Sequence, residues 1–150
     1  MDNQNNNQKS INQKSLTDEQ KAIKIINDEF REQKEFHISR NLPFYIIQNG
    51  FFPTFYFLKE KKKKEKKDGE AGKIIRILEL WLKEKGLIKQ EQENELKEIL
   101  LSNNYIKKRR ITMEALFITN LIKRIADIKS KTNQSKNNES NINESKTLEE

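Results

Sequence analysis

The segment that decides the fold is LPFYIIQNGFFPTFYFLKE, which runs from Leu42 to Glu60. It contains both prolines of the chain, five of its eight phenylalanines and two of its three tyrosines. Asn49-Gly50 separates two apolar runs and predicts a turn, because glycine tolerates the left-handed backbone that ends many helices. Pro43 and Pro53 each lie near the start of a run, where a helix accepts a residue without an N–H. We therefore predict two short helices joined at Asn49-Gly50.

The second of these helices is expected to pack its aromatic side into the core. The side chains predicted to point inward are Phe51, Phe52, Phe55, Tyr56 and Leu58. Their helical spacing favours core packing over a base-stacking platform. Since the aromatic residues are so dense, one or two of them should emerge as an apolar surface spot, a candidate protein contact. A β-hairpin is the alternative for this segment, and Pro53 in its second arm argues against it.

The rest of the chain shows the same helical periodicity. Thr17-Asp18-Glu19-Gln20 has the pattern of a capping box and predicts the start of a helix. The lysines that follow Leu58 can extend the aromatic helix until Asp68-Gly69 and Gly72 break it. The helix that begins at Thr17 is predicted to run to about Glu35, and apolar spacing predicts further helices over Ile74–Lys85, over Gln90–Leu101 and from Thr112 to about Ile128. In these helices Trp81 is expected to be a core anchor, Gly86 a C-terminal cap and Thr112 an N-cap.

The predicted fold class is all-α: a small bundle of about five to six helices with disordered tails. The single helical domain spans residues 16–128, because the length of 150 residues allows one domain. Residues 1–15 and 129–150 are low in apolar residues and are expected to be disordered, since burial there cannot offset the ordering entropy.

Positive charge is concentrated in two patches. The chain carries a net charge of +7, of which the head contributes +1 and the tail 0, so that +6 remains for the body. Lys59–Lys67 contributes +5 and Lys107–Arg110 contributes +4, which leaves the rest of the body slightly acidic. Patches of this kind attract a polyanion.

Phosphate binding by these patches is the functional hypothesis, and a solvated surface is the alternative for each. Lys107–Arg110 lies beside a capped helix and contains two arginines, whose forked donors fit phosphate oxygens. The Lys59–Lys67 run is expected to contribute less, because a mobile lysine run must first be ordered. The candidate RNA-binding residues are Arg40, Lys59, Lys61, Lys62, Lys107, Lys108, Arg109, Arg110, Lys123 and Arg124.

The sequence favours a protein that is not an enzyme. His37 is the one histidine, Ser39 beside it cannot complete a triad, and no glycine-rich phosphate loop is present. The five aspartates lack metal-ligand spacing, so we expect no metal and no cofactor. The absence of cysteine fits a reducing cytoplasm. The first fifteen residues do not form a signal peptide, and no apolar run is long enough to span a membrane.

Three segments together resemble a known family over roughly residues 16–128. They are LPxxIxxNG followed by an apolar run and FLK, then Ile77–Lys83 (ILELWLK), then Thr112–Leu116 (TMEAL) with Leu121–Ala126 (LIKRIA). This order is similar to that of the small helical subunit of the type III-B CRISPR RNA-guided effector, the Cmr complex. Phe52-Pro53-Thr54 and Ile125 depart from the family pattern, which affects the expected local packing.

The resemblance implies a non-catalytic subunit in antiviral defence. Copies of such a subunit stack along a ribonucleoprotein filament, beside other subunits, and contact the backbone of guide and target RNA. No membrane and no small-molecule substrate are implied. Two alternatives remain: a helical protein–protein adaptor whose lysines only keep it soluble, and a basic DNA-binding protein, which the lack of a helix-turn-helix disfavours.

Overall fold

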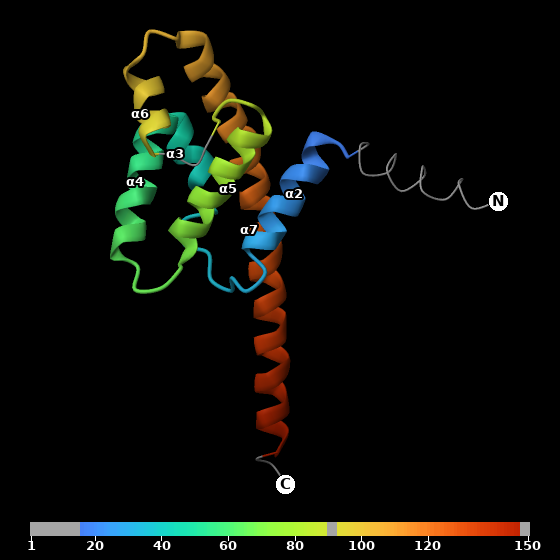
Figure 1. The fold of residues 1–150 in the computed structure, drawn as a ribbon. Coiled ribbons are helices and arrows are strands. Elements are labelled where there is room, and N and C mark those ends of the chain that lie inside the picture. Colours follow the sequence, from blue (N-terminus) through green and yellow to red (C-terminus); the bar gives the residue numbers. More distant parts are fainter. Residues whose placement is uncertain (1–15, 90–92, 148–150) are drawn as a thin grey trace, which may run out of the picture.

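The computed structural model describes residues 16–89 and 93–147, and these form six helices and no strand. The all-α prediction is therefore confirmed for the described part of the chain. Figure 1 shows a bundle from which one long helix projects. In chain order the helices are α2 (Asp18–Glu29), α3 (Leu42–Asn49), α4 (Phe51–Lys64), α5 (Glu70–Glu84), α6 (Glu93–Leu101) and α7 (Tyr105–Thr147).

The α3–α4 joint forms as the sequence predicts. Gly50 has φ +85°, a conformation that side chains rarely adopt, and its N–H donates to Ile46 O at 2.8 Å. Beyond the joint, the buried residues of α4 are Phe51, Phe52, Thr54, Phe55 and Leu58. The prediction for Tyr56 is wrong, because its side chain is 39% exposed. Phe57 is also exposed, so two aromatics emerge, as the density of aromatic residues predicts.

Helix α5 lies at the centre of the bundle and contacts α2, α4 and α7. It begins at Glu70, four residues before the predicted start, so Gly72 lies inside the helix rather than breaking it. Trp81 is fully buried, which confirms it as a core anchor. Gly86 ends the helix with φ +70°, and Leu87 N donates to Leu82 O at 2.9 Å across this turn.

The first helix is shorter than predicted. The capping box forms as expected, with Gln20 N donating to Thr17 Oγ1 at 3.2 Å, but α2 ends at Glu29 instead of near Glu35. Phe30, the residue after the helix, is fully buried. Its ring packs edge-on against that of Phe36, with the ring centres 5.2 Å apart. Burial of these two rings bends the chain away from the helical path that its local sequence allows.

The connector between α2 and α3 is held by one buried carboxylate. Glu70 accepts backbone N–H groups of His37 and Ile38 at 2.8 Å each. It also accepts from Ser39 N at 2.7 Å and from Ser39 Oγ at 2.8 Å. The first residue of α5 thereby fixes the path of residues 37–39, which brings the neighbouring Arg40 to the side of α7.

Helix α7 begins seven residues before Thr112, so the prediction of Thr112 as its N-cap is wrong. Thr112 lies inside the helix, where its hydroxyl donates to Lys108 O at 3.1 Å. Asn104 lies just before the helix, and its side-chain Oδ1 accepts a hydrogen bond from Lys107 N at 3.1 Å. The buried side chains of α7, including Ile111, Ala115, Ile118 and Ile122, face the bundle.

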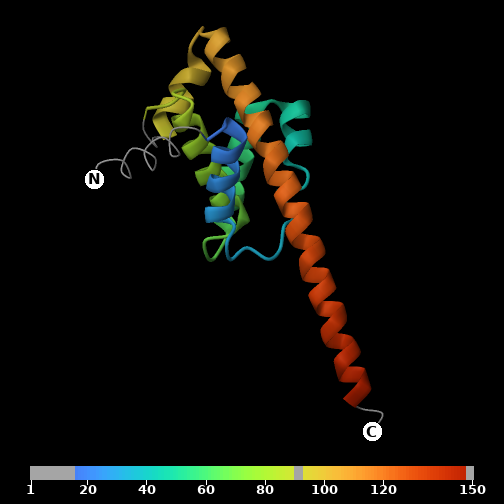
Figure 2. The same ribbon diagram turned by 90° about the vertical axis from the view of Figure 1, so that its right-hand side faces the viewer.

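Beyond the predicted domain end at Ile128, α7 continues as far as Thr147 and projects from the bundle, as Figure 2 shows. Lys129 donates to Phe30 O and Asn133 donates to Lys34 O, so contacts with the body reach Asn133. From residue 131 to residue 140 no side chain is buried. The predicted head, residues 1–15, and the predicted start of α6 at residues 90–92 lie outside the described residues.

Candidate nucleic-acid interface

The structure separates the four consecutive cations Lys107–Arg110. They lie in the first two turns of α7, where successive residues point about 100° apart around the axis. Lys107 and Arg110 therefore share one side, whereas Lys108 and Arg109 point elsewhere. The Lys108 ammonium lies 5.3 Å from the centre of the Tyr105 ring, and Arg109 is exposed. The patch thus divides among several faces instead of presenting four charges together.

Lys107 and Arg110 meet the end of α5 in what we call the corner depression. This hollow of about 300 Å³ is lined by Gly86, Leu87, Asn104, Ile106, Lys107 and Arg110. None of the described residues that line it carries a carboxylate. The space beside Gly86 is open, because a Cβ added to this residue would meet no neighbouring atom within 4 Å. Two cations thus border a small hollow that has no internal counter-charge.

A third cation lies close to the corner depression. Lys85 donates to Asp18 Oδ2 at 2.7 Å, and this bond raises the pKa of Lys85 against the opposing effect of burial. Glu114, 3.9 Å away, raises it further, whereas the nearby charge of Arg110 lowers it. The hydrogen bond also lowers the pKa of Asp18. Lys85 is accordingly paired with acids, which leaves Lys107 and Arg110 as the cations that line the hollow itself.

Arg40 and Lys123, which are 83 residues apart in the sequence, line one hollow that we call the connector depression. Its volume is about 490 Å³, and His37, Asn41 and Asp127 also line it. Arg40 Nε donates to Asp127 Oδ1 at 2.8 Å. This ion pair neutralises part of the local charge, so the connector depression is less basic than the corner depression.

Arg124 does not line the connector depression. It follows Lys123 on α7 and therefore points to another side of the helix. Arg109 lies fourteen residues before Lys123, a spacing that returns to nearly the same side of α7 about 21 Å away. By the same spacing, Lys123 and Arg124 lie about 40° and about 60° to either side of Arg109 around the helix axis. Of these three residues, only Lys123 lines the connector depression with Arg40.

The first part of the lysine run, from Lys59 to Lys64, is helical, so its backbone is already ordered, whereas Lys66 and Lys67 lie beyond the end of α4. Lys61–Lys64 form the last turn of α4. Lys59 and Lys62 line a large groove between α4, α5 and α6, which we call the α4–α6 groove. Lys61 is not among its lining residues, and its ammonium lies 5.6 Å from the centre of the Phe57 ring.

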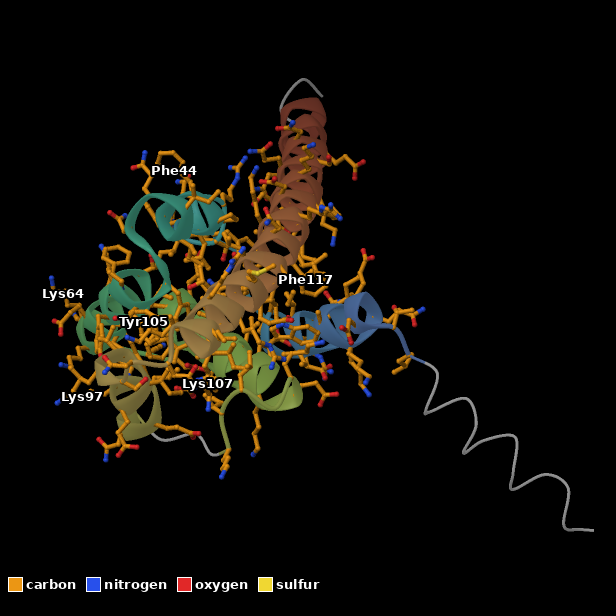
Figure 3. All side chains as sticks on the ribbon, turned by 90° about the horizontal axis from the view of Figure 1, so that it is seen from above. Phe44, Lys64, Lys97, Tyr105, Lys107 and Phe117 are labelled. Carbon is orange, nitrogen blue, oxygen red and sulfur yellow. The ribbon has the colours of Figure 1, made fainter. Side chains whose placement is uncertain are left out.

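Sequence reasoning missed three cations of the α4–α6 groove. Lys63, Arg76 and Lys97 line it together with Lys59 and Lys62. Figure 3 shows Lys64 and Lys97 projecting from the same side of the molecule, whereas Lys107 lies nearer the middle of that view. Lys97 is an isolated lysine on the polar side of α6, and nothing in its local sequence distinguishes it from any solvated lysine.

Among the described residues, no group of three or more histidine, cysteine, aspartate or glutamate side chains is placed to hold a metal ion. In the same part of the chain, no helix combines the length and the apolar character needed to cross a membrane.

The fold and these surfaces define a small all-α protein with several separate basic hollows. A family model described as "CRISPR-associated protein (Cas_Cmr5)" matches residues 11–129, which is most of the chain. The chain therefore belongs to this family, the small subunit of the type III-B CRISPR effector complex, and the resemblance seen in the sequence is confirmed. Searches among curated proteins and among solved structures gave no match.

Proposed function

We propose that this chain is a non-catalytic accessory subunit that binds the phosphate backbone of guide and target RNA and packs against other subunits, including copies of itself. Membership in a Cmr family supports association with other subunits of the effector complex. The observation that carries the RNA proposal is the corner depression, where Lys107 and Arg110 border a hollow whose described lining residues include no carboxylate.

The chemistry of the corner depression fits phosphate and not a base. Arginine presents a planar fork of donors to phosphate oxygens, and lysine adds a compact charge. The positive end of the α7 helix dipole lies beside both residues and attracts anions further. Contacts of this kind position a backbone without reading sequence, which suits a complex whose specificity comes from guide pairing.

The test is a salt series with the double variant Lys107→Gln/Arg110→Gln. On single-stranded RNA, each lost phosphate contact should flatten the slope of log affinity against log salt by about 0.7, so two contacts should remove about 1.4. Unrelated RNA sequences should be affected equally. A matched control, Lys24→Gln/Lys34→Gln, removes the same charge from exposed positions outside the corner depression and should leave the slope unchanged.

An unchanged affinity and slope in the Lys107/Arg110 variant, measured in the reconstituted complex, would show that the corner depression is a solvated surface. The adaptor function replaces the RNA proposal if the wild-type protein joins the complex, its binding to the other subunits is insensitive to salt, and it makes no contact with RNA.

Contact with other subunits is supported by an apolar corner beside the same hollow. Leu101, Tyr105 and Ile106, at the turn between α6 and α7, are between 73% and 78% exposed. Exposed clusters of this kind mark protein contacts in soluble proteins. Leu101→Ser/Ile106→Ser should therefore lower recovery of the chain with the other subunits. Recovery equal to that of wild type would place the subunit contact elsewhere.

A further inference from the structure

The α4–α6 groove is a second basic surface, distinct from the corner depression. Its volume is about 780 Å³ and its walls come from three helices. Among the described residues that line it, five are cations and two are carboxylates, Glu60 and Glu79. We propose that this groove binds a single-stranded segment of RNA by its phosphates, with an unpaired base stacked on Tyr56. The inference rests on the proposed function, because it assigns a path to an RNA strand.

Cations from opposite walls face the groove. Lys62 belongs to α4 and Lys97 to α6. Neither forms a salt bridge within the described part of the chain, and the charge of Lys62 also acts on Asp68. Arg76 differs, since it donates to both oxygens of Asp68 and to Glu29 at 3.0 Å. Lys63 is paired with Glu60 at 3.2 Å. Lys62 and Lys97 are thus placed to neutralise phosphates from both sides.

Lys62 is exposed, and one carbon of its side chain lies near the start of α5. Gly72 of α5 is buried, and a Cβ built there would lie 3.7 Å from Lys62 Cγ. The aliphatic part of Lys62 therefore approaches α5, as amphipathic side chains do beside a neighbouring helix.

An alternative role explains part of the lysine run but not the groove. Lysines in the last turn of α4 stabilise the negative end of its helix dipole, which accounts for Lys61–Lys64 without any ligand. That role does not extend to Lys97, which lies on a different helix and faces the same groove. Convergence of cations from two helices is the observation that points to a polyanion.

Tyr56 gives the groove a preference for unpaired strands. Its side chain is 39% exposed and lines the groove. Grooves that combine cations with an exposed aromatic ring bind single strands, because every base offers a face for stacking. A base inside a duplex is already stacked and cannot use the ring. Tyr56 should accordingly strengthen binding to single strands and leave duplex binding unaffected.

The test uses the full chain and fluorescent oligouridylate and oligoadenylate, as single strands and as their duplex. In the double variant Lys62→Gln/Lys97→Gln, the slope of log affinity against log salt should flatten by about 1.4. The loss of affinity relative to wild type should therefore be about sevenfold smaller at 200 mM salt than at 50 mM salt. Lys66→Gln/Lys67→Gln is the matched control, since it removes equal charge from the same run outside the groove. Tyr56→Leu should weaken binding of the single strands alone.

Each result separates this inference from the proposed function. Equal losses in the groove variant and its control would mean that overall charge, not the groove, governs binding, and would overturn the inference. No loss in the groove variant, with a loss in the Lys107/Arg110 variant, would overturn the inference and leave the proposed function standing. Loss of subunit recovery without loss of RNA binding would assign the groove to a protein and also overturn it. If wild-type chain and complex leave RNA unbound, both proposals fail.

Discussion

Trp81 and Glu114 connect the central helix of the bundle to its longest helix. The indole N–H of Trp81, on α5, donates to Glu114 Oε2, on α7, at 3.0 Å. Phe117, one turn further along α7, stacks on the indole with ring centres 5.5 Å apart. Lys85 lies 5.7 Å from the centre of the indole and 3.9 Å from Glu114 Oε1. The buried indole of Trp81 thus has a hydrogen-bond acceptor for its N–H and an aromatic ring against its face, and α7 supplies both.

Trp81→Ala should lower the free energy of unfolding by about 3–5 kcal/mol, because it leaves a large cavity between α5 and α7. Trp81→Phe should cost less, since most of the buried volume remains. Glu114→Gln retains an acceptor oxygen for the indole and serves as the control. Urea denaturation measures all three, and an alanine variant as stable as wild type would contradict a buried role for this ring.

Glu70→Gln should destabilise the fold by about 2–3 kcal/mol, since it places an amide N–H₂ against donors that now share a buried carboxylate. Ser39→Ala removes one of the four hydrogen bonds and should cost about 1 kcal/mol. Thermal unfolding compares the two variants. A glutamine variant no weaker than the alanine variant would show that Glu70 does not hold the connector.

Gly69→Ala should destabilise the fold through one specific contact. A Cβ at Gly69 would lie 2.5 Å from Glu65 Cδ, and Glu65 Oε1 accepts Ala71 N at 2.9 Å at the start of α5. Displacing this cap should cost about 0.5–2 kcal/mol. In a Glu65→Ala background the same glycine change should cost much less. Additive effects in this double-mutant cycle would refute the contact.

The pair of Asp68 and Arg76 should stabilise the protein in a pH-dependent way. Hydrogen bonds from Arg76, at 2.9 and 2.6 Å, lower the pKa of Asp68, with Coulombic attraction to Arg76 adding to the effect. Asp68 is more than half exposed, so screening limits the contribution to about 0.5–1 kcal/mol. Because the pKa is lower in the folded state, this contribution is complete above the unfolded value of about 4 and is lost as pH falls through the folded value.

Asp68→Asn should therefore be less stable than wild type at pH 7, and the difference should disappear as the pH falls through the lowered pKa of Asp68, measured by urea unfolding at several pH values. A difference that stays constant with pH would show that the carboxylate charge contributes nothing.

Shortening α7 should show where the packed body ends. Removing residues 135–150 should leave the melting temperature unchanged, because the side chains described from residue 134 to residue 140 are exposed. Removing residues 129–150 also deletes the hydrogen bonds from Lys129 and Asn133, and should cost about 1–2 kcal/mol. Equal melting temperatures for both truncations would place the end of the body at Ile128.

Local rules determined most of the helices from the sequence alone. Thr17 and Gln20 cap α2, Gly50 separates α3 from α4, and Gly86 ends α5, because each depends only on residues within one or two turns. The all-α class follows from periodicity, which is also local. The resemblance to the Cmr small subunit was readable for the same reason, since its three segments lie in order along the chain.

Tertiary structure decided where helices stop and which charges meet. The polar stretch after Glu29 is compatible with a longer helix, and only the burial of Phe30 and Phe36, with Glu70 holding the connector, ends α2 early. The same long-range packing brings Lys62 to Lys97, from separate helices. Local sequence does not predict which residues of separate helices come together, because this depends on how the helix faces pack against one another.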